Sequence, residues 1–229
     1  MMALSPNLEL APGDNLTAEE FIRRYENMPG MEKAELIGGV VYMPSPVSVQ
    51  HGDLDSNVNL WLGLYPLHTP GCKTSTNASV FMLRDVPQPD QHLRILTEYG
   101  GRTRKAGKYL QGAPEVIVEV ARSSVSIDLH QKKDLYEGAG VPEYVVVLVE
   151  EGEVRWHQHS RSGYRKLPQS RDGVFRSEVL PGLWLHAKAL LAGDMPQVVR
   201  VLNDGLDSPE HTEFVAQLAE KRRKSRRRS

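Results

Sequence analysis

The sequence has very little cysteine and no long apolar run. Cys72 is the only cysteine among the 229 residues, which excludes an intramolecular disulfide and a zinc site made of several cysteines. The longest apolar run, Tyr144 to Val149, is far too short to cross a bilayer. Residues 1–12 lack the basic start and the apolar centre of a signal peptide. We therefore expect a cytoplasmic protein that does not enter a membrane.

Two common catalytic motifs are also missing. The chain contains neither the G-x-S-x-G elbow of α/β hydrolases nor the G-x-x-x-x-G-K-[ST] phosphate loop, which argues against those two enzyme classes. Among the eight histidines, only His157 and His159 have a spacing that suits a shared ligand, on one face of an expected strand. Such a pair binds a transition metal or faces solvent, and solvent exposure is the commoner arrangement.

Charge is nearly balanced over the whole chain but not along it. The formal net charge is −1, and seven of the 28 lysines and arginines fall within residues 221–229. The rest of the chain has 21 lysines and arginines against 29 aspartates and glutamates, which gives a net charge of −8. A basic tail on an acidic body can contact nucleic acid through counterion release. A solvated tail that only aids solubility is the alternative.

Composition and periodicity divide the chain into three parts. Residues 1–15 contain proline and glycine without periodicity and predict a flexible leader. Residues 16–194 alternate strand-like and helical patterns, and we expect them to form a single α/β domain. Residues 195–229 predict a helical extension that ends in the basic tail. No internal repeat is present.

Within the domain, turn residues and apolar spacing predict the individual elements. A capping box at Thr17 and Glu20 starts a first helix, and apolar residues at helical spacing place a second helix over residues 48–64. Residues 97–112 predict a basic loop or a short helix, and residues 183–191 a closing helix. Residues 34–43 predict a strand pair or one bent strand, with a tight turn or a bulge at Gly38-Gly39. The other expected strands are residues 72–83, 90–95, 115–121, 144–149, 154–159, 163–167 and 174–179. We expect the last three to form a meander that extends the sheet.

The segment from Ala113 to Tyr144 organises the rest of the chain. It predicts a strand over residues 115–121, then a helix, then the start of a second strand. Glu119 is unusual in that strand, because it shares a face with Ile117, and a carboxylate in a covered apolar layer is costly without a metal or a cation. A partner for Glu119 is therefore expected elsewhere in the chain.

A metal ion could be that partner, because three acidic residues occur at strand-like positions: Glu35, Asp90 and Glu119. A hard divalent cation such as Mg²⁺ takes oxygen ligands from carboxylates, water and phosphate. Lys132 adds a cation, because Asp128, Lys132 and Tyr136 follow one another at intervals of four and share one side of a helix. An ammonium on this side could orient a water and stabilise the charge that develops in phosphodiester hydrolysis.

This pattern resembles a known family. The matching motifs, in the same order over about residues 17–194, are residues 34–46, Gln88-Pro89-Asp90, Glu119-Val120, the helix with Asp128, Lys132 and Tyr136, and residues 139–144. They resemble the Uma family of restriction endonucleases, which belongs to the PD-(D/E)XK nuclease superfamily. The resemblance implies a restriction-endonuclease-like α/β fold, in which helices flank a mixed central β-sheet and the antiparallel meander is an addition.

The resemblance also implies roles for individual residues. Asp90 and Glu119 would be the Mg²⁺ ligands, and Glu35 an auxiliary acidic ligand or a holder of water. The superfamily motif has a lysine two residues after the strand carboxylate, where this chain has Ala121. The role of catalytic lysine therefore passes to Lys132, with Lys133 as the adjacent competitor.

Each of these residues also has a structural alternative. Glu119 could belong to a structural ion pair with a lysine or an arginine, which is commoner than an active site. Asp90 could be a turn residue after proline, and Lys132 and Lys133 could cover an exposed helix face. Four matching positions favour the metal site over these alternatives.

The expected function is that of a Mg²⁺-dependent endonuclease that hydrolyses DNA phosphodiester bonds, with Mn²⁺ as a substitute metal. A nuclease-fold module that binds nucleic acid or regulates, without efficient turnover, is the alternative. The acidic body favours this alternative, whereas the basic tail and the Arg102 to Lys108 segment favour DNA binding. A symmetric homodimer would allow both strands to be cut.

Overall fold

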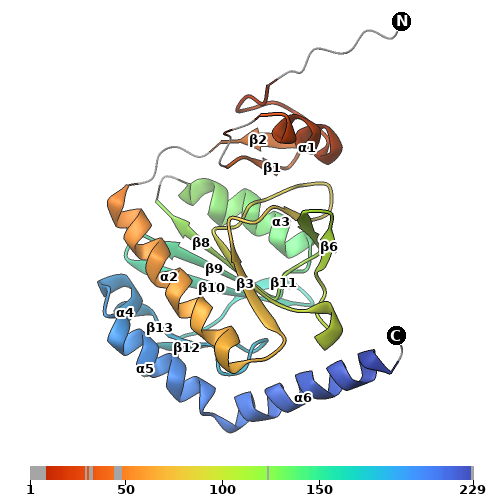
Figure 1. Cartoon of the computed structure of the whole chain (residues 1–229). Helices are drawn as coiled ribbons and strands as arrows, with labels where there is room; N and C mark the ends of the chain where they lie inside the picture. Colours follow the sequence, from red (N-terminus) through yellow and green to blue (C-terminus); the bar gives the residue numbers. More distant parts are fainter. Residues whose placement is uncertain (1–8, 29, 31–32, 44–47, 123, 228–229) are drawn as a thin grey trace, which may run out of the picture.

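The computed structural model describes residues 9–28, 30, 33–43, 48–122 and 124–227. A mixed six-stranded β-sheet forms its centre (Figure 1). The strands follow the spatial order β11, β10, β9, β8, β5, β3. Only β8 and β9 run parallel, and the other neighbours are antiparallel. Their bounds are β3 (Cys72–Thr76), β5 (Gln91–Ile95), β8 (Val116–Ala121), β9 (Glu143–Leu148), β10 (Glu153–Ser160) and β11 (Gly163–Lys166).

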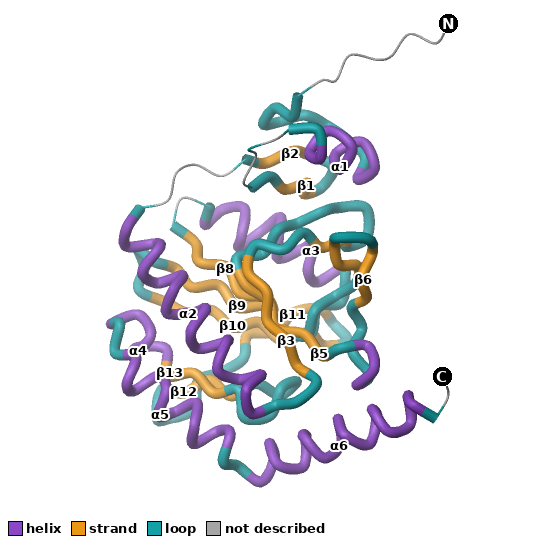
Figure 2. Tube along the Cα trace, in the orientation of Figure 1, coloured by secondary structure: helices purple, strands orange, loops and turns teal. Residues whose placement is uncertain are grey.

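The two faces of β8 are buried in different layers of the core. Val116, Val118 and Val120 belong to the larger cluster, which the helices α2 (Val49–His68), α4 (Ala187–Ala192) and α5 (Met195–Leu206) complete. Ile117 and Ala121 belong to a second cluster with α3 (Lys132–Gly138). Burial on both faces suits the nearly continuous apolar sequence of β8 and β9. Figure 2 shows the helices on either side of the strands.

A small layer caps one end of this sheet (Figure 1). It consists of α1 (Ala18–Glu26) and the hairpin of β1 (Glu35–Ile37) and β2 (Val40–Tyr42). Gly38 and Gly39 form the predicted turn, with φ of 61° and 77°, a conformation that favours glycine. The Asp85 carboxylate accepts hydrogen bonds from both glycine N–H groups at 3.0 Å, which ties the hairpin to the segment before β5.

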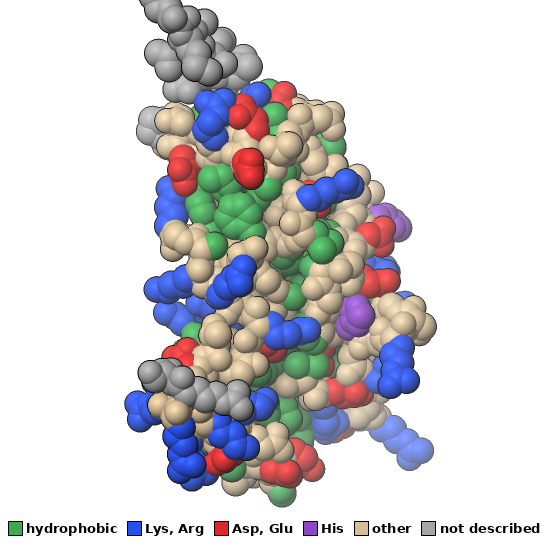
Figure 3. All heavy atoms as spheres, turned by 90° about the vertical axis from the view of Figure 1, so that its right-hand side faces the viewer, with side chains coloured by type: hydrophobic (Ala, Val, Ile, Leu, Met, Phe, Trp, Pro, Cys, Tyr) green, Lys and Arg blue, Asp and Glu red, His purple; other side chains and the backbone are tan. Residues whose placement is uncertain are grey.

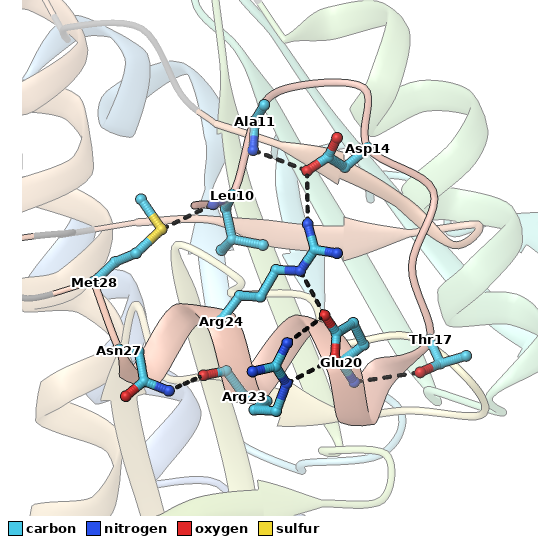
Figure 4. A network of polar contacts seen from close by, with 9 residues as sticks. All are labelled: Leu10, Ala11, Asp14, Thr17, Glu20, Arg23, Arg24, Asn27 and Met28. Carbon is cyan, nitrogen blue, oxygen red and sulfur yellow. Dashed lines mark hydrogen bonds and ion pairs between the residues drawn. The ribbon is translucent and has the colours of Figure 1, made fainter. Parts of the chain in front are cut away.

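Polar contacts hold α1 against the preceding segment (Figure 4). The Thr17 side chain caps the helix by accepting from the Glu20 N–H, whereas the Glu20 carboxylate pairs with Arg23 and Arg24. Arg24 also reaches Asp14. Leu10 is buried, and the Gly13 N–H donates to Val41. Residues 9–15 are therefore packed on the hairpin, in contrast to the loose leader expected for residues 1–15, of which residues 1–8 lie outside the described part.

The segment 97–112 differs from the expected basic loop. After the short η1 (Thr97–Tyr99), it forms the hairpin of β6 (Arg104–Ala106) and β7 (Tyr109–Gln111). β7 also pairs in parallel with β4 (Val80–Phe81), and the three strands form a separate small sheet. This pairing joins segments about thirty residues apart, so the local sequence could not reveal it.

The C-terminal part of the domain corrects two further expectations. Only β10 and β11 extend the central sheet, because β12 (Val174–Arg176) pairs with β13 (Trp184–His186) in a sheet of its own. Residues 183–191 are therefore not one helix but β13 followed by α4. The extension forms α5 and α6 (Pro209–Arg226), and α6 buries Phe214 and Leu218 in the core. None of the helices in the described ranges has the length and apolar character that a membrane span requires.

Candidate active site

The candidate site lies where the hairpin meets the central sheet. Strand pairing brings β5 and β8 side by side, and Asp90, just before β5, falls next to the middle of β8. The Val120 N–H donates to Asp90 Oδ2 at 2.9 Å, and the Asp90 N–H lies 3.3 Å from Glu119 Oε2. These two bonds hold the two carboxylates side by side. The proline before Asp90 fixes its own φ and restricts the residue before it, which orients the entry into β5.

Lys132 joins the acidic residues of three different elements. Its Nζ lies 3.0 Å from Glu119 Oε1 on β8, 3.0 Å from Glu35 Oε2 on β1 and 3.5 Å from Asp128 Oδ1. Only 4% of Lys132 and 1% of Glu119 are exposed. The ammonium therefore replaces water as the partner of buried carboxylates, as such groups require.

Further hydrogen bonds fix the orientation of the Glu119 and Glu35 carboxylates. The Tyr136 hydroxyl, one turn after Lys132 on α3, donates to Glu119 Oε1 at 2.8 Å. The Gln88 N–H donates to Glu35 Oε1 at 2.7 Å. The Tyr136 ring in turn packs edge-on against Tyr144, with centroids 5.0 Å apart. Each carboxylate thus has a defined orientation, which a catalytic or metal-binding group needs.

The helix that carries Lys132 begins with a wide turn. Residues Ile127–Gln131 form a π-helical turn, η2, before α3 starts at Lys132. π-Helical turns are frequent at functional sites. Asp128, on this turn, is buried and accepts a hydrogen bond from the Ser124 hydroxyl at 2.5 Å. The Tyr144 hydroxyl donates to the Asp128 carbonyl at 2.9 Å, which anchors the turn to β9.

A second cation, Lys33, covers Asp90. Its Nζ lies 2.7 Å from Asp90 Oδ1, and 19% of the Lys33 side chain and 15% of the Asp90 side chain are exposed. This contact is the most solvent-accessible part of the cluster, because Lys132 and the remaining carboxylates are almost fully buried. Lys33 and Asp90 are therefore the members of the cluster that solvent touches most.

Burial and mutual repulsion set the charges of the cluster. Burial raises the pKa of Glu119 well above its usual value, and although Lys132 opposes this shift, the neighbouring carboxylates add to it. For Asp90, burial is outweighed by Lys33 and Lys132, which lower its pKa. Burial alone would lower the pKa of Lys132, but the carboxylates around it raise that pKa well above the usual value. The surrounding carboxylates therefore favour the charged form of Lys132.

The structure brings together all four predicted site residues, Glu35, Asp90, Glu119 and Lys132. It also separates Lys132 from its competitor, because Lys133 Nζ points to Glu137 at 3.6 Å and has a side chain 27% exposed. Sequence reasoning gave no role to Lys33, because no periodicity or motif marks it. Asp128 was marked by its spacing from Lys132 and by the matching helix motif, but it was given no role at the site.

Other residues that sequence reasoning singled out lie outside this cluster. Cys72 is buried, and burial raises the pKa of its thiol to about 12, so it is not a nucleophile at neutral pH. His157 is buried and stacks on Tyr144, whereas His159 contacts Tyr164 and the Glu137 carbonyl. The expectation that both histidines face solvent is therefore wrong for His157.

The donor set fits a hard divalent cation in chemistry, although the described side chains do not yet surround one. Glu35, Asp90, Glu119 and Asp128 offer carboxylate oxygens, which are the ligands that a hard divalent cation takes, and these oxygens pair with the ammonium groups of Lys33 and Lys132. The buried Asp128 Oδ1 accepts no hydrogen bond within the described residues. No three Asp, Glu, His or Cys side chains in the described ranges are already arranged as a metal site. Lys33 and Lys132 are instead the partners of these carboxylates.

Comparisons with known proteins agree with this fold. A family model, Uma2, described as "Putative restriction endonuclease", matches residues 18–188. A crystal structure described as "a putative nuclease belonging to DUF820 from Anabaena variabilis ATCC 29413", at 1.96 Å resolution, is 14% identical with a TM-score of 0.60. The match covers 77% of this chain and 98% of that chain, and at this identity it shows the fold alone. No curated protein matches the chain.

The family match spans most of the chain and includes the four predicted site residues. The solved structure independently supports the restriction-endonuclease-like arrangement of a mixed sheet between helices. Both findings confirm the resemblance that the sequence motifs indicated. The chain belongs to the Uma2 family of restriction-endonuclease-like proteins.

Proposed function

We propose that this protein is a metal-dependent endonuclease that hydrolyses phosphodiester bonds in DNA. The observation that carries the proposal is the position of Lys132, whose Nζ lies 3.0 Å from both Glu35 and Glu119. A buried lysine against two strand carboxylates, with Asp90 bonded beside them, supplies an acidic ligand set and a cation for phosphate chemistry.

Asp90, Glu119 and Glu35 would hold a divalent cation, Mg²⁺ with Mn²⁺ as a substitute. The bound cation would polarise the phosphate and lower the pKa of a water molecule. Because Lys33 lies on Asp90 Oδ1, its ammonium has to leave that oxygen before the carboxylate can serve as a ligand. The carboxylates and the backbone bonds that orient them would then position the phosphate for in-line attack.

Lys132 would act as an electrostatic group. Its raised pKa keeps it protonated, so it donates hydrogen bonds and does not remove a proton from water. When Glu35 and Glu119 turn away from it, an N–H of Lys132 becomes available to orient the attacking water. The same charge stabilises the negative oxygens of the transition state.

A nicking assay on supercoiled plasmid with Mg²⁺ or Mn²⁺ tests this proposal. We expect the unaltered protein to convert the plasmid to open circles, and Asp90→Asn and Lys132→Met to lose this activity by at least about a hundredfold. Lys133→Met is the matched control, because Lys133 lies on the adjacent, partly exposed position of the helix. Equal nicking by the unaltered protein and both site variants would identify a contaminant and overturn the proposal.

A nuclease-fold module that binds nucleic acid without turnover is the second candidate. The observation that favours it is the pairing of the acidic cluster with Lys33 and Lys132, because this arrangement is electrostatically complete without a metal. DNA binding by the unaltered protein, together with an absence of nicking over a range of Mn²⁺ concentrations, would select this candidate.

A further inference from the structure

A pocket of about 290 Å³ lies beside the candidate active site and has no part in the proposed hydrolysis. It is lined by α1, the loop between β3 and β4, the segment before β5 and the β6–β7 hairpin. Figure 3, which views the molecule from the side of this hairpin, shows exposed hydrophobic side chains there with basic and acidic side chains around them. Its lining includes Tyr25, Asn77, Ser79, Gln88, Lys108 and Tyr109.

Two hydrogen bonds connect the walls of this pocket to the acidic cluster. The Asn77 N–H donates to the carbonyl of Asp90 at 3.1 Å. The Gln88 N–H donates to Glu35 Oε1 at 2.7 Å. The same backbone segments therefore form the pocket wall and hold Asp90 and Glu35. A polymer bound at Asp90 would place its neighbouring residue next to the pocket.

The pocket presents unused hydrogen-bonding groups. The Gln88 side chain donates to Ser79 Oγ at 2.8 Å and to the Tyr25 hydroxyl at 3.1 Å. Its Oε1 is buried and has no hydrogen-bond partner within the described residues, although only 2% of Gln88 is exposed. Such an orphaned acceptor is uncommon and calls for a ligand or an ordered water.

Asn77 adds a carboxamide at the rim. Its backbone is left-handed, with φ of 48°, which asparagine tolerates better than most residues. Its side chain is exposed and forms no hydrogen bond within the described part of the chain. A carboxamide in this position offers a donor and an acceptor together, the pair that recognises the edge of a nucleobase.

Aromatic rings supply the remaining walls. Tyr109 is held by its hydroxyl, which donates to Glu26 at 3.0 Å, and by an edge-on contact with Phe81 at 5.8 Å. Lys108 Nζ lies 5.4 Å from the Tyr109 ring centroid and pairs with Glu26 at 3.2 Å, which holds its ammonium at the rim. A fixed ring beside a cation suits a planar base that is attached to a phosphate.

We propose that this pocket binds one unpaired nucleobase of the strand whose backbone lies on Asp90 and Glu119. The inference rests on the proposed function, because it takes the ligand to be a nucleic acid strand. A base inside a duplex cannot enter a pocket of this kind without leaving the stack. The preferred substrates are therefore nucleic acids with an unpaired base next to the cleaved bond, such as single strands, flaps and mismatches.

Binding of oligonucleotides in EDTA tests this inference without cleavage. The probes are a single-stranded DNA with one 2-aminopurine and the same strand in a perfect duplex, measured by anisotropy and by 2-aminopurine fluorescence. We expect tighter binding of the single strand and quenching of the fluorescent base. Tyr109→Leu should weaken the single-strand affinity about tenfold, whereas Tyr109→Phe, which keeps the ring, should retain it.

Asn77→Asp provides a second variant that keeps the left-handed backbone and removes the amide donor. It should reduce the preference for the single strand, and Asn203→Asp, the same change on the exposed surface of α5, should not. Equal affinity for single strand and duplex in the unaltered protein, or no effect of Tyr109→Leu and Asn77→Asp, would overturn the inference. Cleavage of the same 2-aminopurine single strand in Mg²⁺ or Mn²⁺ separates the two claims. Cleavage without the 2-aminopurine signal refutes only the pocket, and the signal without cleavage refutes only the hydrolytic function.

Discussion

The Lys132 ammonium lies 3.0 Å from Glu119 Oε1. The two residues meet because α3, which carries Lys132, packs against β8, which carries Glu119. The strand position two residues after Glu119 is taken by Ala121, which is completely buried in the layer beneath α3. The small alanine side chain leaves room for that layer, and the cation arrives from the helix instead. The candidate site therefore depends on the packing of α3 against β8 and β9.

Replacement of Lys132 should affect both stability and activity. Lys132→Met leaves Glu35, Glu119 and Asp128 without their shared cation, and breaking a buried ion pair in this way costs about 3–5 kcal/mol. Lys133→Met removes only a partly exposed pair with Glu137, which is worth about 0–1 kcal/mol. Urea denaturation of both variants measures the difference, and similar free energies of unfolding would contradict the central position of Lys132.

Replacement of Lys33 should strengthen metal binding. Its ammonium competes for Asp90 Oδ1 at 2.7 Å and is only partly buried, so Lys33→Met frees an oxygen at little structural cost. We expect the Mn²⁺ affinity, measured by isothermal titration calorimetry, to rise about tenfold, which corresponds to about 1.4 kcal/mol. Lys105→Met, an exposed change on β6, is the control. An unchanged or weaker affinity for Lys33→Met would show that Lys33 does not compete with the ion.

Glu143 should make the stability of the fold depend on pH. It is completely buried at the start of β9, and burial raises its pKa from 4.5 to about 7 although hydrogen bonds from Ser177 and two backbone N–H groups oppose the shift. The folded state then binds more protons than the unfolded state between pH 4.5 and 7, so this residue's contribution to stability falls as the pH rises through that window.

Glu143→Gln should remove this dependence, because glutamine does not ionise. The free energy of unfolding of the unaltered protein should decrease relative to that of the variant by up to about 3 kcal/mol from pH 5 to pH 8. Denaturation curves at a series of pH values check this result. Parallel curves for the two proteins over that range would mean that Glu143 is charged in both states.

The sequence predicted those parts of the fold that local patterns determine. The Thr17 cap, the Gly38-Gly39 turn and the valine-rich strand that carries Glu119 all appear as expected, because each depends on neighbouring residues. The spacing from Asp128 and Tyr136 favoured Lys132 but left Lys133 as a competitor, because the sequence does not show which way the helix faces. The structure places Lys132 on Glu119 and Lys133 on Glu137.

Elements that depend on distant partners could not be predicted in the same way. The β6–β7 hairpin has a polar sequence and owes its place to β4. β13 is too short to show a period and pairs with β12. Lys33 has no local signal, because its role follows from its contact with Asp90, which only the tertiary fold creates.

The basic C-terminal end of α6 lies far from the candidate active site. Arg222 pairs with Glu98 and lies over the Tyr99 ring, so the helix packs on η1, which follows the end of β5 remote from Asp90. Figure 1 shows α6 at the opposite end of the molecule from α1 and the hairpin. We propose that the tail adds affinity for nucleic acid by charge alone and takes no part in positioning the cleaved bond.

A variant that replaces the exposed tail cations with glutamine tests this role, and Arg222 is kept because it anchors the helix. The altered residues are Arg223, Lys224, Arg226 and Arg227. The slope of log K against log salt for duplex binding should fall by about 0.9 for each lost phosphate contact, while the rate of nicking at saturating DNA stays unchanged. The same change at four exposed cations elsewhere controls for net charge: Arg161, Lys166, Arg171 and Lys188. An equal loss of slope in both variants would mean that the tail acts only through the overall charge of the protein.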